Sequence, residues 1–351
     1  MISKISLSSA EVRSISQLLE AIFNKFTTPE DPGFLHEAPV LAHELPLRIR
    51  NFFNDFRLKE SDEACVCIVS GYPINDGKIG LTPLDRGSKS DTSRTLEEQI
   101  LLVLLGSLLG DPIAWSTQQA GYIVHDVFPV PGQECDQTGS SSKEELLFHT
   151  EDAFHPYRAD YLGMMCLRNV GCQSATTLVS RRVISSLPEE VKNVLFEPRF
   201  VIRPDDSQFE RHPFEKIDEL SEKDFQDFLV YSDNKINQMN TEPEPSAILF
   251  GSPAEPYLRV DCSVYMDALD DEAAQAADIF TKTFNESLCS LEMEPGEICF
   301  IDNFRAAHGR SPFKYPARYD GHDRWLKRIN VSRDLRKSRD MRMTNTSRII
   351  F

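Results

Sequence analysis

The stretch YLGMMCLRNVGCQSATTLVS, residues 161–180, places two short β-rich runs on either side of a polar turn that contains glycine. Similar runs lie before and after it: GYIVHDVF (121–128), RFVIRP (199–204), SAILFG (246–251), YLRVD (257–261) and EICFID (297–302). Runs of this kind, bounded by Pro, Gly, Asn and Asp, are typical of strands. Many short strands with few long helices between them predict a mainly β fold with helices packed outside, a jelly roll or a related barrel. No GxGxxG, P-loop or G-x-S-x-G motif is present, which argues against a Rossmann sheet.

Helical periodicity is clearest in three segments, 9–26, about 95–109 and about 269–288. The first follows a serine that can cap it, and the third opens with acidic residues that suit the positive end of a helix dipole. The length suits one elaborated domain over 1–351. We expect a largely helical N-terminal part, a β core and a basic C-terminal tail, over residues 1–110, 111–335 and 336–351.

Two stretches have the composition of mobile segments. QTGSSSKEE (137–145) is small and polar, and residues 203–243 are strongly acidic and interrupt the series of strands. An insertion of the second kind in a barrel is often a lid over a site. A plain surface excursion is the alternative for residues 203–243.

The net charge of the 351-residue chain is −17, and it is unevenly distributed. From residue 301 on, 13 Lys and Arg stand against 5 Asp and Glu, so the first 300 residues carry −25. Such an acidic body argues against nonspecific binding of nucleic acid or of an anionic membrane. The eight cysteines form no CxxC pair, and the first residues lack the apolar segment of a signal peptide. We therefore expect reduced thiols in a cytoplasmic protein.

A candidate metal site begins with His149 and Glu151, an HxE pair in LLFHTEDAFH (146–155). Because strand side chains alternate with a period of two, both would point to the same face. His308 is the best third ligand, since it follows a turn and a short apolar run. Two histidines and one carboxylate leave three positions open on an octahedral iron, enough for a bidentate 2-oxo acid and O₂. Zinc is the alternative metal, although the helical HExxH of many zinc sites is absent.

Three stretches resemble the clavaminate synthase-like family of Fe(II)/2-oxoglutarate oxygenases: FHTEDAFHPYRADYLGMMCLRN (148–169), IDNFRAAHGR (301–310) and RYDGHDRWLKRINVSRD (318–334). The likeness is greatest to the free amino acid hydroxylases of that family and covers roughly residues 110–335. It implies a double-stranded β-helix, the jelly-roll core, with helices around it. It also implies that His149, Glu151 and His308 bind Fe(II), with 2-oxoglutarate and O₂ as co-substrates.

The resemblance assigns two residue types to 2-oxoglutarate. Arg324, sixteen residues after His308, would bind its distal carboxylate, and the slightly long spacing would arise within SPFKYPARYDG (311–321). Thr176 or Thr177 would assist, with a slight preference for Thr177.

The amino acid substrate has its own expected contacts, again by resemblance. Arg328 would bind the α-carboxylate, because its planar fork suits a bidentate bond. Gln118 or Gln119 would contact the amino group, and Asp261 the polar end of the side chain. In the arginine hydroxylases that this chain resembles, a second aspartate follows two residues after the position of Asp261, where this chain has Ser263. One carboxylate suits a compact ammonium, which favours L-lysine, hydroxylated at C3 or C4.

Three alternatives remain. The first is another outcome of the same iron chemistry: desaturation, ring closure or hydroxylation of L-arginine. Halogenation is disfavoured, because Glu151 takes the position that a halide would need. The second is a non-catalytic barrel that binds an amino acid, against which Glu151 and Arg324 argue. The third is a zinc-dependent hydrolase, for which no water-activating base is evident. The expected partner is a small-molecule amino acid substrate; neither nucleic acid nor a membrane is expected, and the oligomeric state stays open.

Overall fold

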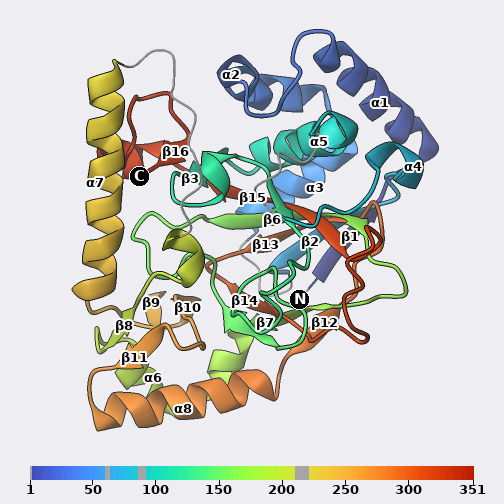
Figure 1. Ribbon diagram of the computed structural model, residues 1–351. Helices are drawn as coiled ribbons and strands as arrows, with labels where there is room; N and C mark the ends of the chain where they lie inside the picture. The colour runs from blue at the N-terminus through green and yellow to red at the C-terminus, as the bar shows by residue number, and fades with distance from the viewer. Residues whose placement is uncertain (1, 60–63, 86–91, 210–220) are drawn as a thin grey trace.

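The computed structural model describes residues 2–59, 64–85, 92–209 and 221–351 (Figure 1). Its largest sheet runs in the order β1-β2-β13-β6-β15-β3-β16, with β4 also paired to β15. The strands of this sheet are β1 (Ile2–Ser6), β2 (Val66–Ser70), β3 (Asp111–Trp115), β4 (His125–Val127), β6 (Tyr161–Arg168), β13 (Ile298–Asp302), β15 (Trp325–Ser332) and β16 (Ile349–Ile350). The pairs β1–β2 and β3–β16 are parallel, and the other pairs of this sheet are antiparallel.

A second, four-stranded antiparallel sheet has the order β12-β7-β14-β5. Its strands are β5 (Leu146–His149), β7 (Thr176–Ser180), β12 (Cys289–Leu291) and β14 (Ala306–Arg310). Two short antiparallel pairs lie beside it: β8 (Phe200–Ile202) with β11 (Met266–Ala268), and β9 (Leu249–Ser252) with β10 (Glu255–Leu258). Both sheets supply residues to one buried apolar cluster, with Met164, Ile301 and Leu326 from the first and Leu178 and Ala306 from the second.

The helices cover the outside of these sheets (Figure 1). Their bounds are α1 (Ser9–Phe23), α2 (Pro32–Leu41), α3 (Leu47–Leu58), α4 (Asp76–Ile79), α5 (Leu96–Ser107), α6 (Glu189–Leu195), α7 (Glu222–Thr241) and α8 (Asp271–Asn285). One apolar cluster joins α1, α2, α3 and α5 to the large sheet, where Phe53 packs edge-on against Phe300. Another joins α6 and α8 to the second sheet, where Phe148 packs on Phe284. The predicted combination of sheets with external helices is confirmed.

The three helices predicted from periodicity correspond to α1, α5 and α8. Ser8 caps α1 in a capping box with Glu11, and Asp270 caps α8. The 20-residue helix α7 was missed, because its acidic surface concealed the apolar residues Phe225 and Ile236, which are buried. It lies within the expected lid at 203–243, of which residues 210–220 fall outside the described residues. The lid function itself stays a prediction.

The C-terminal segment is packed and is not a solvated tail. Strand β16 extends the large sheet beside β3, and Phe351 is buried against Phe225 and Met343. Figure 1 shows α7 alongside this C-terminal end. The stretch 137–145 is likewise more ordered than its composition suggests, since Ser140 and Ser141 are completely buried.

Two further sequence-based expectations can be compared with the fold. In the described part of the chain, no helix is long and apolar enough to cross a membrane. All eight cysteines lie in that part, and none of them forms a disulfide there.

Candidate active site

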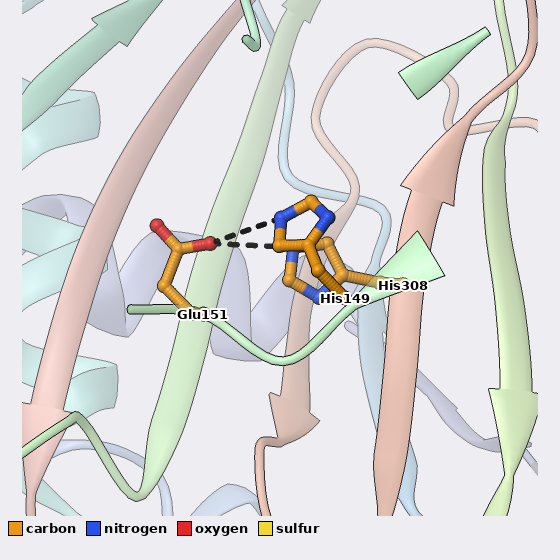
Figure 2. A group of neighbouring side chains, drawn as sticks. All are labelled: His149, Glu151 and His308. Atoms are coloured by element: carbon orange, nitrogen blue, oxygen red, sulfur yellow. Dashed lines mark ion pairs between the residues drawn. The ribbon is translucent and has the colours of Figure 1, made fainter. Parts of the chain in front are cut away.

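The side chains of His149, Glu151 and His308 converge on one point (Figure 2). His149 ends β5 and pairs directly with His308 on β14, so the two rings lie with centroids 4.5 Å apart. Oε2 of Glu151 lies 3.3 Å from Nε2 of His308 and 3.8 Å from Nε2 of His149. The two side chains of the HxE pair therefore converge as predicted, but Glu151 lies in the turn after β5 and not on the strand itself.

Backbone contacts hold this group in place. A Cβ at Gly309 would lie 2.4 Å from the carbonyl oxygen of Leu146, so glycine allows β5 to approach β14 closely. The completely buried Asn303 accepts a hydrogen bond from the backbone N–H of Glu151 at 2.6 Å and donates to its carbonyl oxygen at 3.0 Å. Sequence reasoning missed Asn303, although it lies in the quoted IDNFR segment.

The three side chains fit a divalent metal ion. Their ligand atoms, two imidazole nitrogens and one carboxylate oxygen, lie within 4.8 Å of one another. Nδ1 of His149 lies 2.9 Å from the carbonyl oxygen of Leu147, which fixes the tautomer with Nε2 free to bind a metal. Burial lowers the pKa of His308, which keeps it neutral. Burial raises the pKa of Glu151, but the charge of Arg328 and the contact with His308 outweigh it and hold that pKa well below the usual range.

A single cavity surrounds this group and contains nearly all of the other predicted site residues. Its walls include Thr176, Arg324, Arg328, Asp261, Gln118 and Gln119. Thr177 does not line the cavity. In the pairing of β7 with β14, Thr176 lies opposite Arg310, on the same face of the sheet as His308. Thr177 lies opposite Gly309, on the other face. The placement therefore favours Thr176 over the slightly preferred Thr177.

Arg324 lies immediately before β15, and the segment between β14 and β15 absorbs the long spacing from His308. It is 5% exposed, and within the described residues its guanidinium has neither a hydrogen bond nor an ion pair. Burial lowers its pKa to about 10, so it remains a cation at neutral pH. A buried cation facing a cavity without a protein partner indicates a site for an anion.

Arg328, by contrast, has protein partners at both terminal nitrogens, although its buried Nε has none among the described residues. Its guanidinium donates to Glu151 Oε1 at 2.6 Å and to Gln118 Oε1 at 3.1 Å, and it contacts Nδ1 of His125 at 2.8 Å. The amide of Gln119 bonds the backbone of Asp126 in both directions at 3.1 Å. Both candidate glutamines line the cavity, but of the two it is Gln118 that contacts Arg328, while the amide of Gln119 is held by the backbone of Asp126. His125 was not singled out from its strand-like run GYIVHDVF.

Of the other acidic residues that line the cavity, Asp126 pairs with Lys327, Asp152 accepts from Trp115, and Asp205 carries a charge that acts together with that of Asp261. Asp205, in the segment that follows β8, lines the same cavity. Burial raises the pKa of Asp205, and the negative charges of Asp261 and Glu151 raise it further. Asp261 also accepts a hydrogen bond from the backbone N–H of Ser263 at 2.9 Å. Sequence reasoning missed Asp205 because it lies in the acidic insertion, far from Asp261 in the chain.

Comparison with known proteins agrees with this geometry. Residues 112–330 match the family described as taurine catabolism dioxygenase TauD, TfdA family. The chain is 38% identical to the enduracididine beta-hydroxylase of Streptomyces hygroscopicus over 99% of both proteins. It is 35% identical to an L-ornithine/L-arginine 3-hydroxylase of Catenulispora acidiphila, again over 99% of both. The crystal structure of the non-heme iron oxygenase OrfP with Fe, succinate and (3S)-hydroxy-L-Arg superposes with a TM-score of 0.88 at 37% identity, covering 99% of this chain and 100% of OrfP.

Fold and site together define an enzyme of the non-haem iron, 2-oxoglutarate-dependent dioxygenase class. More narrowly, the chain belongs to the TauD/TfdA family. The resemblance to clavaminate synthase-like amino acid hydroxylases is thereby confirmed. The alternatives of a zinc hydrolase and of a non-catalytic barrel lose their support.

Proposed function

We propose that the protein hydroxylates an unactivated carbon of a free L-amino acid that carries a guanidinium group, such as L-arginine. Fe(II), O₂ and 2-oxoglutarate take part, and succinate and CO₂ are released. The observation that carries this proposal is that one cavity holds the three candidate metal ligands, the unpartnered Arg324 and the pair Asp205 and Asp261. These groups match a metal, a dicarboxylate co-substrate and a cationic amino acid. In this proposal the two sheets around the cavity form a double-stranded β-helix within a single domain.

Different residues of the chain bind the metal and 2-oxoglutarate. His149, Glu151 and His308 hold the metal, and bound Fe(II) supplies the activation of O₂ coupled to decarboxylation of 2-oxoglutarate. Arg324 binds the distal carboxylate of 2-oxoglutarate through charge-assisted hydrogen bonds, with Thr176 in the same cavity wall. The buried position of Arg324 strengthens this interaction, because little water competes with the carboxylate.

The amino acid end of the substrate has partners that are already positioned. Gln118 and His125 hold the guanidinium of Arg328 before any ligand arrives, and its planar fork suits the α-carboxylate. The carbonyl oxygen of Gln118 is an acceptor suited to the α-amino group. Because Arg328 also contacts Glu151, an α-carboxylate bound there lies close to the metal site. This proximity and the names of the two relatives support hydroxylation at C3 over C4.

The expectation of L-lysine needs revision. It rested on a single carboxylate, Asp261, for the far end of the side chain. Asp205 supplies a second carboxylate from another segment, and of the two similar enzymes named above one acts on enduracididine and the other on L-ornithine and L-arginine. A guanidinium offers five donors in a fixed fork and can serve two carboxylates, which a compact ammonium does less well. L-Lysine remains the second candidate.

Two further parts of the proposal concern the protein as a whole. Residues 203–243 contribute Arg203, Asp205 and Ser207 to the cavity, which supports their role as a lid that excludes water during reaction. The eight cysteines, none of which forms a disulfide in the described part of the chain, support a reducing, cytoplasmic location.

The proposed function can be tested by measuring succinate formation from 2-oxoglutarate in the presence of Fe(II), O₂ and single L-amino acids. We expect succinate and a product heavier by one oxygen atom with L-arginine, and little with neutral amino acids. L-Ornithine, L-lysine and L-enduracididine complete the panel. Succinate without an oxidised amino acid from any member would contradict a free amino acid as the substrate.

Replacing Arg324 separates the co-substrate from the substrate. In Arg324→Met we expect the KM for 2-oxoglutarate to rise by about ten- to a hundredfold, because a charge-assisted hydrogen bond contributes roughly 1.5–3 kcal/mol. The KM for the amino acid, measured at saturating 2-oxoglutarate, should change less than about threefold. If only the amino acid KM rises, the roles assigned to Arg324 and Arg328 must be exchanged.

A further inference from the structure

The backbone of Arg324 is held by a buried glutamine that no part of the proposed mechanism uses. Oε1 of Gln173 accepts the Arg324 backbone N–H at 2.9 Å, and Nε2 of the same side chain donates to Oδ1 of Asp323 at 3.0 Å. Gln173 and Asp323 are each 2% exposed. One amide group therefore bridges two consecutive residues at the point where the chain enters β15.

Asp323 completes this arrangement, although it is the acidic residue adjacent to Arg324 in the chain. Its carboxylate accepts the backbone N–H groups of Arg318, at 3.0 and 3.1 Å, and of Tyr319, at 2.6 Å. Tyr319 has a φ of 55°, which closes the loop before β15. The carboxylate is thus occupied by backbone donors and by Gln173. Arg324 keeps its charge free for a ligand, because its neighbouring acid forms no ion pair with it.

Gln173 also lies three residues before Thr176, on the segment that leads into β7. The carbonyl oxygen of Gln173 accepts the backbone N–H of Lys314, from the loop between β14 and β15. The amide of Gln173 therefore joins the segment that carries Thr176 to the residue that carries the free guanidinium. The pairing of β7 with β14 fixes Thr176, and the Gln173 amide ties the backbone of Arg324 to the segment that leads into that strand.

We propose that Gln173 is a positioning residue for dicarboxylate binding: through its hydrogen bonds to Arg324 and Asp323 it sets the affinity for 2-oxoglutarate without touching it. This inference rests on the proposed role of Arg324. The amino acid end of the cavity, around Arg328, has separate supports in His125 and Gln118. Loss of the bridge should therefore weaken the binding of 2-oxoglutarate selectively.

The first test compares two buried glutamines. Gln173→Met keeps the length of the side chain and removes both hydrogen bonds. Gln99→Met is the matched control, because Gln99 is equally buried at 2% exposure but lies in α5 and bonds Thr95. Affinity for 2-oxoglutarate is measured by calorimetry on the Mn(II)-loaded protein without O₂, followed by affinity for L-arginine at saturating 2-oxoglutarate. We expect roughly tenfold weaker 2-oxoglutarate binding for Gln173→Met alone, as two buried hydrogen bonds are lost.

The second test reverses the polarity of the bridge. Gln173→Glu keeps an acceptor for Arg324 but sets two carboxylates against each other, so 2-oxoglutarate binding should weaken. Adding Asp323→Asn places an NH₂ group in the position of Oδ1, where it can donate to the new carboxylate. The backbone N–H of Arg318 loses its bond to Oδ1, but the oxygen in the position of Oδ2 still accepts from Arg318 and Tyr319. The double variant should recover most of the lost affinity. Affinity for L-arginine separates a positioning role from a general structural defect: it should stay nearly unchanged in both variants, whereas a general defect would weaken the binding of both ligands.

The possible results distinguish this inference from the proposed function. If Arg324→Met weakens 2-oxoglutarate binding and Gln173→Met binds it as well as Gln99→Met does, the positioning role is wrong and the function stands. If neither Arg324→Met nor Gln173→Met changes 2-oxoglutarate binding, the assignment of Arg324 fails as well. If Gln173→Met does not fold, the double variant decides: binding no stronger than that of Gln173→Glu overturns the inference.

Discussion

His308→Ala is expected to lower turnover by at least roughly a thousandfold and to leave the purified protein with little bound metal. A metal site of this kind contributes several kcal/mol to catalysis, and each 1.36 kcal/mol is a factor of ten in rate. The same result is expected for His149→Ala and Glu151→Ala, since each supplies one of three ligand atoms that lie within 4.8 Å of one another. Metal content after reconstitution with Fe(II) and succinate formation are the two measurements.

His155→Ala provides a matched control for these variants. His155 is also buried and lies four residues from Glu151, but its ring packs at a tilt against Trp115 and does not line the cavity. Burial lowers its pKa to about 3, so it is neutral in the fold. His155→Ala should lower the melting temperature and keep normal metal content. Full metal occupancy and full activity in any one of the three ligand variants would remove that residue from the metal site.

The metal site was predictable from the sequence because it depends on local geometry. His149 ends β5 and Glu151 lies two residues further on, in the turn after that strand, so the short HxE spacing keeps both side chains close to one point although only one of them is on a strand. The choice between Thr176 and Thr177 needed the register of β7 against β14, since a shift of one residue exchanges the two faces. The sequence could not show which of Gln118 and Gln119 contacts the site, for another reason. Gln119 and Ala120 have φ angles of 41° and 56°, which break the regular alternation.

The groups that the sequence could not reveal are those that tertiary structure brings together. Asp205 and Asp261 are separated by a segment that includes the whole of α7, and only the folded chain places both in one cavity. Gln173 meets Arg324 across a sequence separation of 151 residues. Helix α7 itself has an apolar pattern, with Phe225, Leu229 and Ile236 on one face. This periodicity predicts a helix, although the acidic composition of residues 203–243 suggests a mobile segment.

L-Arginine is expected to be hydroxylated in preference to L-lysine when both are present at equal concentration. The physical reason is the pair Asp205 and Asp261: burial, and after it the charge of Asp261, raises the pKa of Asp205, and a bound cation would stabilise both carboxylates. Removing one carboxylate should reduce recognition of arginine. For Asp205→Asn or Asp261→Asn we expect kcat/KM for L-arginine to fall by about ten- to a hundredfold, as one charged hydrogen bond contributes roughly 1.5–3 kcal/mol.

Asp206→Asn is the control, because it makes the same change of charge one residue away, at an exposed side chain that does not line the cavity. It should leave kcat/KM for L-arginine nearly unchanged. Competition between the two amino acids, followed by mass spectrometry of the products, measures the preference directly. If both carboxylates bind the guanidinium, Asp205→Asn and Asp261→Asn should each shift the product ratio toward hydroxylysine. The reason is that the ammonium of lysine needs only one carboxylate, and each variant keeps one. A wild-type enzyme that forms mainly hydroxylysine, or variants that retain the full preference for arginine, would refute the guanidinium assignment and leave the iron site untouched.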